Sequence, residues 1–552
     1  MGLRYTLRSQ LFLMSCTALI LFCSSNINGQ VSLSEEQWVL PTYQVSPPDK
    51  NPMFFKGESY QGASRYIYPY GLNDVISNEK SDQAWTALIL ENEYIKLCVT
   101  PEIGGKLYYG TDKTNGYNFL YKNNVVKPSN IGMTGAWVSG GIEWCVIHHH
   151  RASTFLPVDY HLQENDDGSK TIWIGETEPR HRMRWTIGIT AFPGKSYYMA
   201  DVKIHNSTPY ANTFLYWANV ATHTNKDYQV IFPPSVGVAT YHAKNSFTRW
   251  PISNEVFNGE DFTRGVDLSW WVNSVNQNSY FAYDLKEDFM GAYDHGKGAG
   301  TVHIGDHHVV KGAKLWEWGS GVRGQATEGT LTENDGPYVE IMVGAFSDNQ
   351  PDYSWIKPYE VKQFRHYWYP VKDIRGFKYA NLDGAVNLVQ EEDHQVFLGY
   401  YSTQKVGRAK IILTKNDAVV FEKVVQIDPE TAFTQLVDVG GEFEITDLYT
   451  EMIDMDNNQV LVSYGPVAKT VIEKLPDEVK RPVLPQDMKT IEELYLAGSR
   501  ILQFYNPTLN AMDYFQEVLE RDPMDSRTNV AVGKIHLKNG EYNLARRYFS
   551  VA

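Results

Sequence analysis

Short runs of alternating apolar and polar residues dominate the middle of the chain. Between Trp85 and Val371, β-rich runs such as RWTIGITAF and PYVEIMVGAF are separated by turn sequences such as NDDG, PGK and NSTP. Many short strands at close spacing are typical of a large β-sandwich or barrel. A second, smaller β-rich region follows over 380–465.

The last part of the chain has a helical pattern. Small and aromatic positions recur there at a spacing of 34 residues, in the pairs Ala511/Ala545, Tyr514/Tyr548 and Phe515/Phe549. This spacing is the period of the tetratricopeptide repeat, and two unrelated amphipathic helices are the alternative. Because such repeats usually stack in threes and need a polar cap, we expect a truncated array.

These changes of pattern predict six segments. They are a leader (1–29), an N-terminal extension (30–76), a large β-sandwich (77–371), a small β-rich domain (372–473), a linker rich in proline and charge (474–487) and helical repeats (488–552).

The leader has the pattern of a secretory signal peptide. Two arginines precede the apolar run Leu11–Cys23, which is too short for a membrane span. Cleavage would leave Gln30 as the first residue of a periplasmic or extracellular protein. Lipid attachment at Cys23 is the alternative, which the bulky Phe22 disfavours. No later run approaches the ~20 apolar residues of a spanning helix, so we expect no transmembrane span.

Composition narrows the classes of function. With 50 Lys+Arg against 65 Asp+Glu, the net charge is −15, which argues against binding to nucleic acid. Aromatic residues make up 13% of the chain, which suits sugar binding and β-sandwich cores alike. Cys98 and Cys145, the cysteines beyond the leader, lie in apolar runs, so we expect buried thiols and no thiol catalysis.

Two blocks of sequence resemble the galactose-mutarotase-like proteins. They are ENEYIKLCVTPEIGGKLYYGTDKTNGYNFLY, at Glu91–Tyr121, and GPYVEIMVGAFSDNQPDYSWIKPYEVKQF, at Gly336–Phe364. With the leader and the repeat tail, the chain looks like a family of exported bacterial proteins known as a domain of unknown function. The resemblance implies a mainly β fold: a mutarotase-like β-supersandwich, a small β-rich domain and a tetratricopeptide-like helical segment. It says little about the reaction, because this fold carries several activities.

No motif with a fixed mechanism is present, so the candidates are acids and histidines among aromatic residues. The densest group is WVSGGIEWCVIHHHRAS, at Trp137–Ser153. Burial on a strand would raise the pKa of Glu143, as a general acid requires. On a continuing strand His148 and His150 would share one face and His149 the other. The alternative is an exposed strand edge with Glu143 paired to Arg151.

Further candidates lie later in the chain. The resemblance places Glu340 at the general base of mutarotases and offers His223 as a catalytic histidine, although His223 follows its aromatic pair where the family's histidine precedes it. Glu317 stands between two tryptophans, an environment suited to a perturbed carboxyl, and an ion pair with Lys314 is the alternative. Glu360 matches a proline–glutamate turn, and we expect a structural role for it rather than a catalytic one.

We therefore predict Glu143, Glu340, Glu317, His150 and His223 as catalytic residues. The side chains predicted to bind substrate are Trp144, His148, His149, Arg151, Trp217, Trp316, Trp318 and Glu360. On a strand, His307 and His308 would point to opposite faces and could not both hold one ion. We expect no cofactor. Calcium binding is the alternative, because the chain contains many acidic residues.

The leading hypothesis is an exported glycoside hydrolase that uses paired carboxylates on a polysaccharide or oligosaccharide. An aldose epimerase, with Glu340 as base and a histidine as acid, is the first alternative. A non-catalytic glycan-binding or scaffold protein is the second, and in any of these the helical repeats could hold a protein partner.

Overall fold

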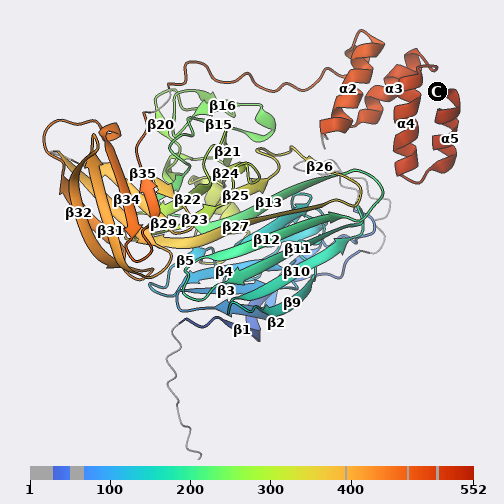
Figure 1. Cartoon of the computed structure of the whole chain (residues 1–552). Helices are drawn as coiled ribbons and strands as arrows, with labels where there is room; N and C mark the ends of the chain where they lie inside the picture. Colours follow the sequence, from blue (N-terminus) through green and yellow to red (C-terminus); the bar gives the residue numbers. More distant parts are fainter. Residues whose placement is uncertain (1–28, 50–66, 392–393, 469–470, 505–508) are drawn as a thin grey trace, which may run out of the picture.

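The computed structural model describes residues 29–49, 67–391, 394–468, 471–504 and 509–552 (Figure 1). The predicted leader up to residue 28, with its alternative at Cys23, lies outside the described residues. Two large antiparallel sheets pack face to face, a smaller β unit follows, and helices form the C-terminal part. The predicted fold class is confirmed.

The larger sheet has 13 strands, and its main path runs β1-β2-β3-β4-β8-β13-β25-β24-β21-β15-β16. Its strands are β1 (Ser32–Val45), β2 (Ile76–Glu91), β3 (Ile95–Thr100), β4 (Lys106–Asp112), β5 (Asn118–Leu120), β8 (Ile142–Ile147), β13 (Asn212–His223), β15 (Val238–Thr240), β16 (Phe247–Arg249), β21 (Asn278–Ala282), β24 (Gly312–Glu317), β25 (Tyr338–Ala345) and β26 (Ser354–Ile356).

The second sheet has eight strands in the order β14-β22-β23-β27-β12-β11-β10-β9. These are β9 (Asp159–Glu164), β10 (Lys170–Glu178), β11 (Met183–Ala191), β12 (Tyr198–Asn206), β14 (Tyr228–Ile231), β22 (Phe289–Asp294), β23 (Ala299–Ile304) and β27 (Val361–Lys372). Short hairpins and one helix lie in the connections: β6 (Ser129–Gly132), β7 (Gly135–Trp137), β17 (Ile252–Ser253), β18 (Val256–Phe257), β19 (Glu260–Asp261), β20 (Val266–Asp267) and α1 (Val322–Glu328).

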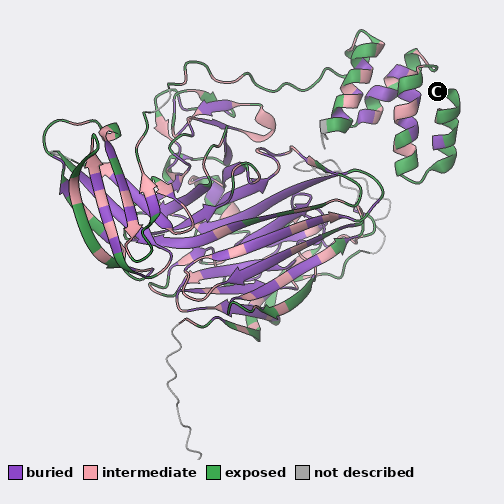
Figure 2. Cartoon of the chain, in the orientation of Figure 1, coloured by how far each residue is buried: buried purple, intermediate pink, exposed green. Residues whose placement is uncertain are grey.

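The larger sheet is buried on both faces along its central strands (Figure 2). Side chains alternate along a strand, so one face of β8 and β13 joins the main core between the sheets, with Trp144 and Tyr216. The opposite face carries a smaller apolar cluster that includes Cys145, Trp217 and Met342. The candidate acids lie on the strands between these two clusters.

The N-terminal segment joins the large sheet. β1 pairs along most of its length with β2, from Ser32 opposite Glu91 to Tyr43 opposite Lys80. Pro41 lies within β1, and proline is tolerated there because the strand is at the edge of the sheet.

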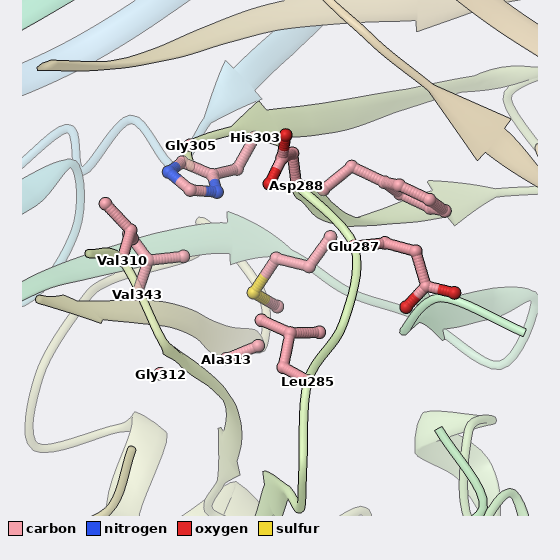
Figure 3. Close-up of a pocket in the computed structure, with 11 residues that line it drawn as sticks. Leu285, Glu287, Asp288, His303, Gly305, Val310, Gly312, Ala313 and Val343 are labelled. Carbon is pink, nitrogen blue, oxygen red and sulfur yellow. The ribbon is translucent and has the colours of Figure 1, made fainter. Parts of the chain in front are cut away.

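A polar chain crosses the core between the two sheets. The Tyr216 hydroxyl and Nε2 of His366 share a hydrogen bond of 2.9 Å, and Nδ1 of His366 lies 3.2 Å from Nε2 of His303. A cavity of about 10 Å³ borders His303, with Val310 and Leu285 on its other walls (Figure 3). It has room for about one water molecule.

The small β unit consists of two four-stranded sheets with their own apolar core. One sheet holds β28 (Tyr379–Ala380), β29 (Gly384–Gln390), β30 (Gln395–Ser402) and β33 (Phe433–Asp438). The other holds β31 (Val406–Lys415), β32 (Ala418–Ile427), β34 (Leu448–Asp454) and β35 (Gln459–Tyr464).

The C-terminal part is helical, with α2 (Ile491–Phe504), α3 (Ala511–Arg521), α4 (Ser526–Lys538) and α5 (Tyr542–Val551). Each hairpin packs a glycine against an aromatic ring: an added Cβ would lie 2.6 Å from Phe515 at Gly498 and 2.4 Å from Phe549 at Gly533. The recurrence of this contact fits the predicted tetratricopeptide-like tail. Among the described residues, no helix is both long and apolar enough to cross a membrane.

Candidate functional site

Four neighbouring strands bring two of the predicted acids onto one face of the large sheet. Glu143 on β8 lies opposite Asn219 on β13. Two positions further along β13, Ala221 lies opposite Glu340 on β25, which in turn lies opposite Trp316 on β24. Directly opposed residues of an antiparallel sheet point to the same side, so Glu143, Asn219 and Glu340 share a face.

The carboxylate of Glu143 is surrounded by hydrogen-bond donors. Oε2 accepts from Nε1 of Trp137 at 2.7 Å and lies 2.9 Å from Nδ1 of His150. Oε1 accepts from the Thr154 hydroxyl at 2.7 Å, and Nδ2 of Asn219 lies 3.5 Å from Oε2. With only 3% of its surface exposed, this carboxylate is fixed in one orientation.

The charge state of Glu143 differs from the sequence-based expectation. Burial alone would raise its pKa, but attraction from His150, the hydrogen bond between them and the nearby Lys106 hold the pKa well below its ordinary value. The prediction of a protonated general acid at Glu143 is therefore wrong. The prediction rested on the apolar neighbours of Glu143 in the sequence, which does not show the hydrogen-bond donors that the fold places around its carboxylate.

Glu340 has the opposite character. Burial raises its pKa to about 7, and repulsion from Glu143 adds to this, while attraction from His150 and Lys314 opposes it. Near neutral pH Glu143 is therefore ionised, while Glu340 is close to the midpoint of its titration. Such a pair of carboxyls with separated pKa values is a common arrangement for acid–base chemistry.

Two buried lysines lie beside these acids; sequence reasoning missed Lys106 and considered Lys314 only as a partner of Glu317. Nζ of Lys106 on β4 donates to the Gly140 carbonyl at 2.7 Å, and Nζ of Lys314 on β24 donates to Oε1 of Gln350 at 2.7 Å. Burial lowers the pKa of Lys106 to about 8 and that of Lys314 to about 7, and Glu340 opposes both shifts. The available signal was a lysine inside an apolar strand, in GGKLYYG and GAKLWEWG.

The three consecutive histidines lie in a turn, because β8 ends at Ile147. The expected alternation of faces is therefore wrong. The rings of His149 and His150 lie together, with centroids 4.0 Å apart, while the ring of His148 packs 4.4 Å from that of His181. His150 adopts a φ of 44°, and this bend turns its ring back toward Glu143.

Glu317 lies on the other face of the large sheet. It follows Trp316, which shares a face with Glu340, so its side chain points to the opposite side. Burial raises its pKa well above the ordinary value. Glu317 was predicted as a catalytic residue with Glu143 and Glu340, but the structure does not bring it to their site.

Two predicted substrate-binding residues are structural. Trp144 is fully buried in the core between the sheets, where its Nε1 donates to the Gly105 carbonyl at 3.1 Å. The Arg151 guanidinium donates to the carbonyls of Trp144 and Gly104 and stacks 4.6 Å from the ring of Trp185. The alternative ion pair of Arg151 with Glu143 does not form, since Arg151 faces Glu176 instead, at 3.8 Å.

The remaining predicted aromatic residues lie on or near the face of Glu340. Trp217 and Trp316 belong to the apolar cluster of that face, and Trp318 packs against it while donating to the Tyr338 hydroxyl at 3.0 Å. Glu360 lies in a turn, where its carboxylate accepts from the Lys357 amide at 2.6 Å, as expected for a structural residue.

His223 ends β13 on the same side as Ala221, opposite Tyr338. Its ring lies 4.2 Å from that of Tyr121, and its Nε2 accepts from the Lys122 amide at 3.4 Å. Burial lowers its pKa to about 4. His223 is therefore neutral near pH 7 and already holds one hydrogen bond.

Within the described part of the chain, two groups of side chains bring three potential metal ligands together: Cys145, His149 and His150 in the buried site, and Asp306, His307 and His308 on the surface. In the first group, Nδ1 of His149 lies 3.1 Å from the Gln350 amide, whose oxygen is already used by Lys314. In the second, both histidines lie in a turn, so the argument from strand faces does not apply to them.

Comparison with solved structures finds a repeat-containing protein and proteins related to mutarotases. A TPR-domain containing protein from Parabacteroides distasonis ATCC 8503 is 18% identical, covers 94% of this chain and 79% of its own, and has a TM-score of 0.55. A putative aldose 1-epimerase from Klebsiella pneumoniae subsp. pneumoniae MGH 78578 is 11% identical, with coverages of 62% and 92% and a TM-score of 0.37. A galactose mutarotase-like protein from Clostridium acetobutylicum is 9% identical, with coverages of 52% and 96% and a TM-score of 0.36. The first of these supports the fold alone.

Two family models match the chain. The model described as the second domain of YphG-like proteins matches residues 379–464, which form the small β unit. The model described as a domain of unknown function (DUF5107) matches residues 63–371, more than half of the 552 residues. The chain belongs to the DUF5107 family.

Proposed function

We propose that the protein is a carbohydrate-active enzyme that transfers protons at a sugar ring, with Glu340 as general base and His150 as its acid partner. The observation that carries this proposal is Glu340 itself: a buried carboxyl whose pKa lies at about 7, on the face where His150 is held. A group with a pKa near the working pH is best suited to exchange protons. The sequence resemblance to galactose-mutarotase-like proteins supports a sugar as the substrate.

Glu143 acts as a positioning residue in this scheme. Its two oxygens face four donors, so little of the carboxylate is left to attack a substrate. A fixed carboxylate at Nδ1 of an imidazole sets the tautomer and the orientation of the ring. Glu143 would hold His150 in this way.

The reaction that fits these roles is interconversion of the anomers of an aldose. Glu340 takes the proton of the hydroxyl on the anomeric carbon, while His150 gives a proton to the ring oxygen and the bond between that oxygen and the anomeric carbon breaks. Rotation about the adjacent bond and the reverse proton transfers close the ring as the other anomer. The scheme uses side chains alone and calls for no cofactor.

A glycoside hydrolase is the second candidate, because an ionised Glu143 and a protonated Glu340 are the two states that such enzymes need. It requires a free lone pair on Glu143, and the four donors count against this.

Two assays separate the candidates. The relaxation of freshly dissolved α-D-glucose and α-D-galactose, followed by polarimetry, should be faster with the protein than without it, and Glu340→Gln should abolish the difference. Release of reducing ends from oligosaccharides without faster anomer relaxation would favour the hydrolase. The absence of both activities would point to a protein that binds glycans without catalysis.

We further propose that the protein is exported and that its helical tail holds a protein partner. The leader pattern supports export, and N-terminal sequencing of the secreted protein should begin near Gln30. A lipid-modified N-terminus at Cys23 would instead place it on a membrane surface.

A further inference from the structure

A second cavity, of about 920 Å³, lies between the sandwich and the small β unit. The sandwich contributes the segment after β14 and the residues around Trp250, while the small unit contributes Asn387 and Tyr464. Ligand pockets of roughly 300–1,000 Å³ prefer such domain interfaces. None of the residues assigned to the acid–base site lines this cavity, so it constitutes a separate site.

The charged residues on its wall all have one sign. Arg249, Arg375 and Lys378 line the cavity, and its described lining contains no aspartate or glutamate, in a chain of net charge −15. Arg249 is engaged, since it pairs with Glu255 and donates to the Ile472 carbonyl at 2.9 Å. Arg375 is mostly exposed and contacts Glu391 at 3.2 Å, and Lys378 is exposed. This excess of positive charge favours an anionic ligand.

The rest of the wall indicates that the ligand also has apolar faces and hydroxyl groups. Phe232 and Trp250 line it with their ring centroids 4.7 Å apart, and Phe377 and Tyr464 add two further aromatic side chains. Asn387, only 1% exposed, donates from Nδ2 to two carbonyls, while no described group bonds its Oδ1. Because Oδ1 is itself covered, the hydroxyl groups of a ligand would instead meet the exposed Thr446, which also lines the cavity.

We propose that this cavity binds an oligosaccharide that carries carboxylate groups. Inorganic phosphate or a simple carboxylate would match the cations but offers no surface for the aromatic rings. A uronate-containing oligosaccharide supplies the negative charge, the hydroxyl donors and the flat faces of sugar rings, which pack against aromatic side chains. The volume exceeds that needed for a single sugar ring, so we expect at least two rings to be held.

The test is titration calorimetry of the full chain with trigalacturonate and with the trimethyl ester of the same trisaccharide. Trigalacturonate should bind, and the ester should bind about ten-fold more weakly or worse, because it keeps the sugar rings but lacks the three negative charges. The double variant Arg375→Gln/Lys378→Gln should lose affinity for trigalacturonate to a similar extent. Both side chains are exposed, so the variant should fold normally.

Two control variants make the result specific. Lys423→Gln removes an exposed cation from the same β unit, away from the cavity, and should bind trigalacturonate as the unmodified chain does. Glu340→Gln should also bind it normally, so the two sites can fail independently. Absence of trigalacturonate binding, equal binding of the ester, or binding unaffected by the double variant would overturn the proposal. Displacement of trigalacturonate by equimolar inorganic phosphate would also overturn it, because the cavity would then bind anions without recognising the sugar.

Discussion

At the scale of single residues, the environment of each carboxyl decides its chemistry. Glu143 and Glu340 lie on one sheet face and are equally buried, at 3% and 5% exposure. Glu143 is ringed by donors, which stabilise its ionised form, whereas for Glu340 burial outweighs the nearby positive charges. The same residue type thus has two different pKa shifts on one face of the sheet.

Replacement of Glu340 tests its role as general base. Glu340→Gln keeps the shape but removes proton transfer, which contributes ~10²–10⁴-fold to rate. We expect the turnover number in anomer relaxation to fall by that factor with little change in KM. Glu317→Gln is the matched control, because it alters a buried glutamate on the opposite face of the neighbouring strand. Equal losses in the two variants would assign both effects to folding.

The pH dependence of the reaction follows from the same carboxyl. A general base must be ionised, and burial raises the pKa of Glu340 to about 7. We therefore expect kcat/KM to rise as the pH increases through about 7. A base with the ordinary glutamate pKa of 4.5 would give this rise at a much lower pH. A profile that is flat between pH 6 and 8 would contradict this role.

At the scale of secondary-structure elements, the strands were more predictable than their ends. The runs around Glu143 and Glu340 have the composition of buried strands, and they form β8 and β25. The end of β8 was missed because three consecutive histidines carry no glycine or proline to signal a turn. The pairing of β1 with the sheet was equally hidden, since Pro41 counts against a strand unless the strand is known to be an edge.

The approach of β25 to β13 depends on a glycine. An added Cβ at Gly344 would lie 2.3 Å from the ring of Trp217, which is buried and packed against Phe281. Gly344→Ala should lower the free energy of unfolding by about 1–3 kcal/mol through overpacking. Gly407→Ala, at an exposed position of β31 where an added Cβ has no neighbour within 4 Å, should change it by less than about 0.5 kcal/mol. Chemical denaturation of both variants measures the difference.

The polar chain between the sheets should make stability sensitive to acid. Burial lowers the pKa of His303 to about 3, and that of His366 lies well below its ordinary value for the same reason. Both are neutral when folded, whereas an unfolded histidine takes up a proton below about pH 6.5. Stability is therefore full above pH 6.5 and should fall as the pH drops toward 3. Thermal unfolding at a series of pH values measures this effect. In His303→Gln the midpoint temperature should fall less steeply with decreasing pH, and an unchanged dependence would contradict a role for His303 in acid sensitivity.

At the scale of the whole molecule, the β units and the helical tail have separate apolar cores. Removal of the residues after Met488 should therefore leave sugar binding intact, because each core can form without the other. Calorimetry on the shortened chain and on the full chain measures this directly. An insoluble product, or one that has lost all affinity for ligand, would show that the tail and the β units fold as one cooperative structure.

Glu143 and Glu340 are separated by nearly two hundred residues, and they meet only through the pairing of β8 and β25 with β13. Pairing between such distant segments carries a large loop-closure entropy and is slow. During refolding, activity should therefore return later than the bulk of the strand signal in circular dichroism. A newly made chain would therefore stay inactive until these distant strands have paired.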